Sequence, residues 1–202
     1  MVIIGLCGGS GAGKTAASAA MASLGAAVIN TDEVYREITY PGSPCVRDIA
    51  DAVRRSVVND DGSLNRAVLA ALVFSDDEAR SRLNSVAHRH IKKATEALLE
   101  RYRNDGYPAA IVDAPLLFES GFDKMCDVTV CVVANQDARI ARIMKRDGIS
   151  EAQAAARIGS QYDDAELRCL CDYTIENDGT PEELMSAAKE IYNEIIEKRQ
   201  RT

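Results

Sequence analysis

The segment that most constrains this chain lies near its start, where residues 8–15 read GGSGAGKT. They fit the pattern G-x-x-x-x-G-K-[ST] in full, which is typical of a loop that wraps around phosphate groups. Glycines allow this wrapping because they lack a Cβ, so that successive backbone N–H groups can point at one anion. Lys14 can place its charge near the outer phosphates, and the Thr15 hydroxyl can ligate Mg²⁺. The pattern therefore predicts a site for a nucleoside triphosphate.

The residues on either side of this loop fit the same structure. Val2 to Cys7 is a short apolar run rich in β-branched residues, typical of a strand that is buried on both faces. From Lys14 to Ser23 the chain is rich in alanine, which favours a helix, and Gly25 can end that helix. A strand before the loop and a helix after it are the structural context that the motif requires.

Strands and helices are predicted to alternate along the rest of the chain. We expect four more short strands, at residues 26–30, 109–113, 128–133 and 173–176, with helical patterns between them. This alternation predicts an α/β fold with a mainly parallel sheet. The stretch 40–107 breaks the alternation and favours several helices, including one at about residues 77–103. We interpret it as a helical insertion within a single domain of residues 1–202.

The last helix is marked at its start. Thr180 can serve as the N-cap, Pro181 suits the first helical position, and Glu183 completes a capping box. Apolar residues then recur at helical spacing, which predicts one buried face. The residues expected on that face are Leu184, Ala188, Ile191 and Ile195.

Charge and hydropathy narrow the classes of partner. The 202 residues include 24 Lys and Arg against 31 Asp and Glu, so the formal net charge is −7. Proteins that bind nucleic acid or anionic membranes are usually basic, so we expect neither partner, whereas a small phosphorylated ligand needs only a local positive pocket. The apolar run after Met1 is too short for a signal peptide, and no stretch approaches the roughly 20 apolar residues that span a bilayer. We therefore expect a cytoplasmic protein.

The cysteines and histidines do not form a metal-binding pattern. Six cysteines lie at scattered spacings, which favours reduced thiols over a disulfide framework. Cys169 and Cys171 form a C-x-C pair, and His88 and His90 form an H-x-H pair. Neither pair has a second ligand pair at a suitable spacing, so we expect no metal site from them.

Two aspartates follow predicted strands, at the edge where a parallel sheet binds its ligands. Asp113 ends the third strand, where a carboxylate can hold Mg²⁺ or its water shell; the alternative is a cap or turn before Pro115. Asp32 follows the second strand, and its carboxylate can accept the proton of an acceptor hydroxyl or orient that hydroxyl. The alternative is that Asp32 or Thr31 caps the next helix.

Arginines gather in residues 136–161. Arg139, Arg142 and Arg146 are three and four residues apart, so they share one helix face, and Arg157 lies on a further predicted helix. Stacked arginines repel one another unless an anion or acidic partner lies among them, and ATP phosphates are such a partner. We interpret this segment as a lid over the nucleotide. The alternative is a solvated face that pairs with neighbouring acidic residues.

Three classes of protein carry a loop of this kind: small-molecule kinases, GTP-binding switches and assembling ATPases. A guanine-binding switch usually has an N-K-x-D motif after a late strand, which this sequence lacks. An assembling ATPase usually needs a larger core and an arginine supplied by a neighbouring subunit. A small-molecule kinase needs an acceptor pocket, a carboxylate near the acceptor hydroxyl and an arginine-bearing lid. This chain has a candidate for each, so the kinase class is favoured.

Several motifs, in the same order along the chain from residue 3 to about residue 190, resemble those of dephospho-CoA kinases. Besides the glycine-rich loop, Thr31-Asp32 resembles the end of an aspartate motif, and residues 113–119, DAPLLFE, are the most specific match. The other matching residues are Pro41, Gly42, Gly62, Ser63, Leu64, Asn65, Arg66, Leu69, Phe74, Leu83, Asn84, His88, Gln136, Arg139, Arg142, Arg157, Gln161, Asn177, Asp178 and Gly179.

The resemblance implies a P-loop kinase core with a five-stranded parallel sheet of order 2-3-1-4-5, a helical acceptor-binding insertion at 40–107 and a lid at 136–161. It implies ATP-dependent phosphorylation of the ribose 3′-hydroxyl of dephospho-CoA, giving coenzyme A and ADP with Mg²⁺ as cofactor. No obligate protein partner is expected. The alternative is a related P-loop kinase that acts on another nucleotide or small metabolite.

The resemblance also implies roles for single residues. Asp32, Lys14 and Arg142 would be catalytic, with Asp32 as the base or hydroxyl-orienting group, and Thr15 and Asp113 would bind Mg²⁺, in part through water. The residues expected to bind ATP are Gly8, Gly9, Ser10, Gly11, Ala12, Gly13, Lys14, Thr15, Ala16, Arg139, Arg142, Arg146 and Asn177. The residues expected near dephospho-CoA are Asp32, Arg66, His88 and Phe118. The sequence departs from the family where Cys7, Asn30 and Arg89 replace the commoner Thr, Asp and Pro.

Overall fold

The computed structural model of this chain describes residues 1–159 and 161–200, apart from the side chains of residues 55 and 200. The chain divides into two compact units. The first unit comprises Met1–Ile29 and Tyr102–Thr202, and the second comprises Asn30–Arg101. The predicted arrangement of one domain over residues 1–202, with an insertion at 40–107, stays a prediction.

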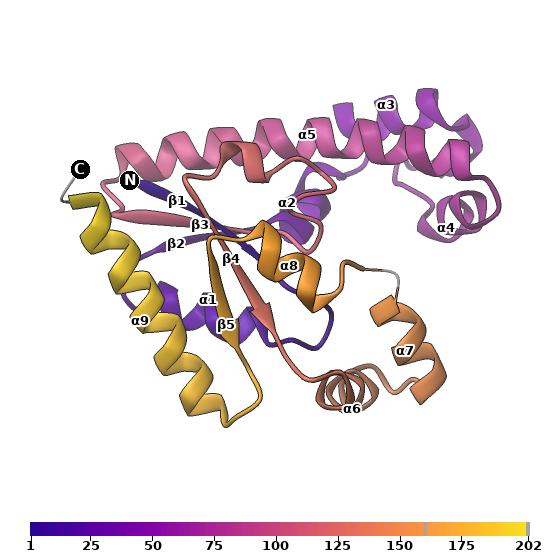
Figure 1. Cartoon of the computed structure of the whole chain (residues 1–202). Coiled ribbons are helices and arrows are strands. Elements are labelled where there is room, and N and C mark those ends of the chain that lie inside the picture. Colours follow the sequence, from indigo (N-terminus) through magenta and orange to yellow (C-terminus); the bar gives the residue numbers. More distant parts are fainter. Residues whose placement is uncertain (160, 201–202) are drawn as a thin grey trace. The chain divides into compact units, whose positions relative to one another are not determined.

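The first unit is built on a five-stranded parallel sheet (Figure 1). Its strands are β1 (Val2–Cys7), β2 (Ala27–Asn30), β3 (Ala109–Asp113), β4 (Val128–Val133) and β5 (Tyr173–Glu176). They lie in the order β2-β3-β1-β4-β5, which confirms the predicted fold class and strand order. All of β3 is buried, as are all but one residue of β1 and of β4, which explains why these segments are continuous apolar runs.

Two helices cover one face of this sheet, α1 (Lys14–Ala22) and α9 (Pro181–Gln200) (Figure 1). The small side chains of α1 let it pack closely against the strands. The capping box predicted for α9 is present, since the Thr180 N–H and the Glu183 N–H each donate to the other residue's side chain, at 2.7 and 3.2 Å. The helix residues in the shared core are Ala17, Ala20, Met21, Leu184, Ala188, Tyr192 and Ile195. Ile191, which we expected to be buried, is only partly covered, and Tyr192 is buried beside it.

The other face of the sheet is covered in part by the chain between β3 and β4, which includes the short helix η2 (Asp123–Met125). Gly5 of β1 shows how close this packing is. A Cβ on Gly5 would lie 2.9 Å from the Cys126 sulfur and 3.0 Å from a Leu117 methyl carbon. A glycine at this place in the strand therefore serves close packing rather than a turn.

Three helices follow β4: α6 (Gln136–Asp147), α7 (Glu151–Gly159) and α8 (Asp164–Leu170). Asn135 caps α6 by accepting from the Asp137 N–H at 2.9 Å, and Gly148, with a φ of +66°, ends it. Asp163 begins α8 with a capping box. The predicted lid at residues 136–161 thus spans α6 and α7, which contact each other.

The second unit consists of helices, as the sequence indicates. They are α2 (Thr31–Ile38), α3 (Pro44–Ala52), η1 (Arg55–Val57), α4 (Arg66–Ser75) and the part of α5 (Asp77–Asn104) up to Arg101. Their side chains form a separate core, and its buried members are Cys45, Val46, Ile49, Ala50, Val57, Leu64 and Leu69. A single antiparallel bridge between Val58 and Leu64 closes the turn before α4. No helix in the described ranges combines the length and the apolar content needed to cross a bilayer.

All six cysteines are free thiols, and their surroundings predict unequal reactivity. Burial raises the pKa of Cys45 to about 11 and that of Cys126 to about 12. Cys169 is exposed. Since the thiolate is the reactive form, we expect iodoacetamide to label the exposed Cys169 first. Cys45 should react roughly a hundredfold more slowly and Cys126 roughly a thousandfold more slowly at mildly alkaline pH.

Mass spectrometry of tryptic peptides over a time course measures these rates. Unfolding in guanidinium chloride is the control, and it should make the three rates similar. Labelling of Cys126 as fast as Cys169 in the folded protein would contradict the burial of Cys126.

Candidate functional site

The phosphate-binding loop joins β1 to α1, and its glycines are required by the backbone. Gly8, Gly11 and Gly13 have φ values of +151°, +78° and +105°, which residues with a Cβ rarely adopt. A Cβ on Gly8 would also lie 2.5 Å from the Val132 carbonyl oxygen, and one on Gly11 would lie 2.7 Å from the Arg139 carbonyl oxygen. The loop therefore follows a path that only glycine permits, pressed against β4 and α6.

Lys14 and Asp113 form a salt bridge at the end of this loop. Lys14 is the first residue of α1 and Asp113 is the last residue of β3, so the fold brings together residues that are far apart in the sequence. Asp113 is 2% exposed, and a carboxylate so deeply buried requires a charged or hydrogen-bonding partner. Thr15 is the next residue of α1 and is exposed. A cation, a carboxylate and a hydroxyl thus gather at a helix N-terminus, where anions bind favourably.

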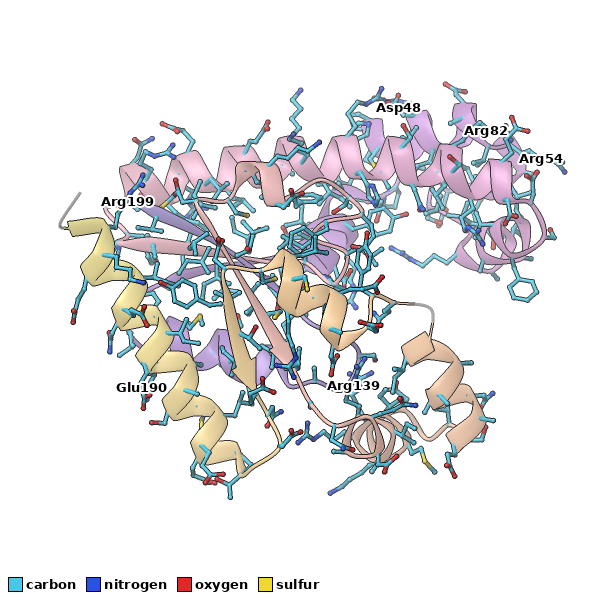
Figure 2. All side chains as sticks on the ribbon, viewed as in Figure 1. Asp48, Arg54, Arg82, Arg139, Glu190 and Arg199 are labelled. Atoms are coloured by element: carbon cyan, nitrogen blue, oxygen red, sulfur yellow. The ribbon has the colours of Figure 1, made fainter. Side chains whose placement is uncertain are left out.

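Arg139 is a residue of α6 whose side chain extends to the start of α8 (Figure 2), and it is 3% exposed. Its Nε donates to the Ser10 carbonyl at 3.0 Å, and its Nη1 donates to the Asp164 carboxylate at 2.8 Å. Its Nη2 is buried and has no hydrogen-bond partner among the described residues. Arg142, one turn further along α6, donates to the Gly11 carbonyl at 3.2 Å. Both arginines therefore lie at the loop, and they contact its carbonyl oxygens.

Asn177 follows β5 and also contacts the loop. Its Nδ2 donates to the Ala12 carbonyl at 2.6 Å, and its own carbonyl accepts from Arg142 Nη2 at 3.1 Å. Its backbone N–H donates to the Val133 carbonyl at 2.9 Å, which fixes its place beside β4. The resemblance implies that Asn177 binds ATP, through a late motif that lies near the adenine in this family. In the structure its side-chain amide donates to the loop, and a contact with ATP stays a prediction.

Arg146 and Arg157 lie elsewhere, and both pair with Asp147. Arg146 Nε donates to the Asp147 carboxylate at 2.7 Å, and Arg157 donates to its other oxygen. Hydrogen bonds from Arg146 and then Arg157 lower the pKa of Asp147 to about 2. For these two arginines the structure matches the solvated face that the sequence left open as an alternative. A contact between Arg146 and ATP stays a prediction.

Two residues with contacts at the loop or at Arg139, Gln161 and Asp164, were not among the predicted site residues. The Gln161 side-chain oxygen accepts from the Ser10 N–H at 2.8 Å, so the far end of the lid segment is hydrogen-bonded to the loop. Asp164 holds Arg139, and its only sequence signal is its place next to the capping residue Asp163. A polar cavity of about 450 Å³ lies here, and Gln136, Arg139, Gln161 and Tyr162 are among the residues that line it.

In the second unit, Asp32 lies on the first turn of α2 and is exposed. Asn30 is the N-cap of that helix, since its side chain accepts from the N–H groups of Asp32 and Glu33 at 3.0 and 3.1 Å. The helix-capping alternative for Asp32 therefore does not hold, because Asn30 makes the capping bonds. The Asp32 carboxylate is left accessible at the start of the helix.

The other acceptor candidates in this unit lie on α4 and α5. Arg66 donates to the Thr39 hydroxyl at 3.2 Å, and its guanidinium lies 5.8 Å from the centre of the Tyr35 ring. His88 is half-buried, and burial lowers its pKa, which favours the neutral imidazole at physiological pH. Phe118, the remaining candidate, belongs to the first unit and is half-buried after β3.

Arg89, the residue that replaces the family's usual proline after His88, takes part in a contact between two helices. Arg89 and His90 both contact the Asp48 carboxylate at 2.8 Å, which ties α5 to α3. The helix α5 runs unbroken through Arg89, where a proline would remove a backbone hydrogen bond and kink the helix. His88 and His90 are two residues apart on this helix, so they face different directions. Within the described residues, no three His, Cys, Asp or Glu side chains gather as a metal site.

Comparison with known proteins agrees with this geometry. The family model of dephospho-CoA kinases matches residues 2–183. A dephospho-CoA kinase of Corynebacterium jeikeium is 39% identical over 185 residues, which is 92% of this chain and 95% of the relative. One of Mycolicibacterium paratuberculosis is 37% identical over 196 residues, covering 97% of this chain and 48% of the relative. The chain thus spans about half the length of the mycobacterial relatives that it matches.

Solved structures share the fold. A Thermus thermophilus protein superposes with a TM-score of 0.79 at 30% identity, covering 96% of this chain and 97% of that one. A dephospho-CoA kinase of Campylobacter jejuni superposes with a TM-score of 0.70 at 21% identity, over 98% of both chains. A shikimate kinase of Bacteroides thetaiotaomicron, at 14% identity and a TM-score of 0.56 over 96% of this chain and 98% of its own, has the same core fold. Given the family match along residues 2–183 and a 39% identical relative of similar length, this chain belongs to the dephospho-CoA kinase family.

Proposed function

We propose that this protein transfers the γ-phosphoryl group of ATP to the ribose 3′-hydroxyl of dephospho-CoA, giving coenzyme A and ADP. The observation that carries the proposal is the glycine-rich loop with the Lys14–Asp113 pair at its end, in a chain of the dephospho-CoA kinase family. ATP and dephospho-CoA are its expected partners. We place the protein in the cytoplasm, where its free thiols stay reduced.

In this proposal the loop binds the phosphates of ATP through its backbone N–H groups and the N-terminus of α1. Lys14 adds a full charge beside the β- and γ-phosphates, exchanging its bond with Asp113 for phosphate oxygens. Arg142, from its place at the loop and with its bonds to Gly11 and Asn177 kept, would add positive charge as negative charge develops on the γ-phosphoryl oxygens. Arg146, on the same helix, would add a second charge.

Mg²⁺ fits the oxygen donors at this place. It prefers oxygen ligands and usually takes one or two from the protein, with the rest from phosphates and water. The Thr15 hydroxyl and the Asp113 carboxylate, in part through water, are the residues that would hold it. When bound, the ion supplies neutralisation of the phosphate charge.

Asp32 would act on the acceptor. Its exposed carboxylate can accept a hydrogen bond from the 3′-hydroxyl and orient that oxygen in line with the γ-phosphorus. The new bond joins the 3′-oxygen to phosphorus, the bond between the γ-phosphorus and the bridging oxygen of ADP breaks, and the hydroxyl proton passes to Asp32. Arg66, His88 and Phe118 would contact dephospho-CoA.

A substrate panel tests this function. Purified protein with Mg-ATP is given dephospho-CoA, nucleoside monophosphates, nucleosides or small hydroxy acids, and ADP release is measured. We expect ADP release with dephospho-CoA alone. Release with one of the other acceptors but not with dephospho-CoA would overturn the proposal.

Replacing Asp32 tests the role of its carboxylate. Asp32→Asn keeps the size of the side chain but weakens its ability to accept the hydroxyl proton, so we expect kcat to fall by roughly 10²–10⁴-fold. The affinity for ATP, measured by calorimetry, should stay within about twofold of the wild-type value. Glu33→Gln, the neighbouring carboxylate on α2, is the matched control and should leave kcat unchanged. Near-normal turnover of Asp32→Asn would remove Asp32 from the mechanism.

Replacing Arg146 separates the lid from a solvated face. If Arg146 leaves Asp147 to contact ATP, Arg146→Ala should lower kcat at least about tenfold, because a charge that stabilises the transition state is lost. Lys145→Ala removes a neighbouring exposed charge on α6 and serves as the control. Unchanged kcat in both variants would show that Arg146 only pairs with Asp147, a surface contact worth about 0–1 kcal/mol.

A further inference from the structure

Three consecutive carbonyl groups of the phosphate-binding loop are held from outside by side chains. Arg139 Nε donates to Ser10 O at 3.0 Å, Arg142 Nη1 to Gly11 O at 3.2 Å, and Asn177 Nδ2 to Ala12 O at 2.6 Å. The donors lie between 129 and 165 residues away in the sequence from the carbonyls that they bind. We call Arg139, Arg142 and Asn177 the carbonyl clamp.

The orientation of these carbonyls matters because each peptide plane fixes two groups at once. The N–H and the C=O of a trans peptide point in opposite directions, so N–H groups can converge on an anion only if the carbonyls turn away from it. Carbonyls that turn into a partly buried region need donors there, since an unmet carbonyl costs free energy. The clamp supplies one donor for each carbonyl. The Ala12 N–H, which is opposite the Gly11 carbonyl, donates to the Gly9 carbonyl at 3.0 Å, so the clamp acts on an anion through the N–H groups of Gly11 and Gly13.

The clamp is itself held in place. Arg139 is 3% exposed and is fixed by Asp164 at 2.8 Å, and Asn177 is 5% exposed and bonded through its backbone to Val133 at 2.9 Å. Arg142 links the clamp residues on α6 to Asn177, because its Nη2 donates to the Asn177 backbone carbonyl at 3.1 Å. These donors cannot swing away without breaking contacts of their own.

The glycines of the loop agree with this arrangement. A Cβ on Gly9 would overlap the Arg139 guanidinium, and one on Gly13 would overlap the Asn177 amide. Gly11 lies so close to α6 that its Cβ would be 2.7 Å from the Arg139 carbonyl oxygen. The three glycines therefore make room for clamp residues on the outer side of the loop, in addition to giving the backbone its freedom.

We propose that Arg139, Arg142 and Asn177 are positioning residues that set the affinity of the loop for phosphates by holding its carbonyls outward. For Asn177 this is a different role from a contact with the adenine base. The inference rests on the proposed function only in that the loop binds the phosphates of a nucleotide. It does not depend on which acceptor receives the phosphoryl group.

Inorganic tripolyphosphate, which has no adenine base, shows whether Asn177 acts on the phosphate-binding loop or on the base of ATP. Asn177→Ala removes the donor to Ala12, and Asn177→Asp keeps the size of the side chain but places an acceptor against that carbonyl. The dissociation constant of ATP and the inhibition constant of inorganic tripolyphosphate against ATP are measured for both variants. We expect both constants to rise by the same factor, about 10- to 100-fold, which corresponds to one buried hydrogen bond lost.

The same two constants are measured for a control variant on α9. Asn193→Ala, an exposed asparagine of α9, should change neither constant. A rise for ATP with tripolyphosphate unchanged would assign Asn177 to the base and overturn the clamp. Unchanged constants in both variants, or a wild-type protein that tripolyphosphate does not inhibit, would also overturn it.

A second pair of variants tests Arg139 if the Asn177 variants fail to fold. Gly9→Ala should weaken tripolyphosphate binding because its Cβ meets the Arg139 guanidinium. Arg139→Lys removes the Nε donor to Ser10, which the Cβ of Gly9→Ala already displaces, so the double variant should bind about as weakly as Gly9→Ala alone. A double variant weaker than Gly9→Ala, with the two losses multiplying, would contradict the clamp.

If phosphates bind as expected but dephospho-CoA is not phosphorylated, the proposed function fails and the clamp stands.

Discussion

The structure around the loop depends on one constraint, which is that the N–H groups of a short loop can bind phosphate only from a particular set of backbone orientations. A loop can satisfy this only if its peptide planes are turned together, and the opposite carbonyls then need partners of their own. Here Arg139, Arg142 and Asn177 provide those partners, and glycines provide the space that they occupy. The sheet order places β1, β3 and β4 side by side, so the loop, Asp113 and the start of α6 meet at the same edge.

Charged side chains are distributed unevenly along the chain. Its net charge of −7 conceals a contrast between segments. Residues 137–161 carry five basic and three acidic side chains, whereas residues 163–202 carry five basic and eleven acidic ones. Some of the acidic groups serve the site indirectly, since Asp164 fixes Arg139 at the loop. The acidic total is therefore compatible with anionic substrates, because positive charge is concentrated in the segments proposed to meet phosphates.

The sequence predicts what local pattern controls and fails where distant packing decides. The five strands and the helix α9 with its capping box follow from apolar runs and helix caps. The strict loop motif predicts where Lys14 lies, but its salt bridge with Asp113 at the end of β3 is seen only in the structure. Three arginines at helical spacing predict a shared face, but not that Arg139 and Arg142 bind loop carbonyls while Arg146 binds Asp147. That division depends on which neighbours each guanidinium reaches after folding, as does the contact between Asn177 and Ala12. The capping role of Asn30 was likewise decided by backbone geometry at the start of α2.

The central claim is that this fold delivers a phosphoryl group to one particular hydroxyl. Phosphorus–proton correlation NMR of the product formed from dephospho-CoA and Mg-ATP measures this directly. We expect a new phosphomonoester signal that correlates with the ribose H3′ proton, together with one equivalent of ADP. A signal that correlates with another ribose proton, or ADP that appears with inorganic phosphate and no new ester, would contradict the account.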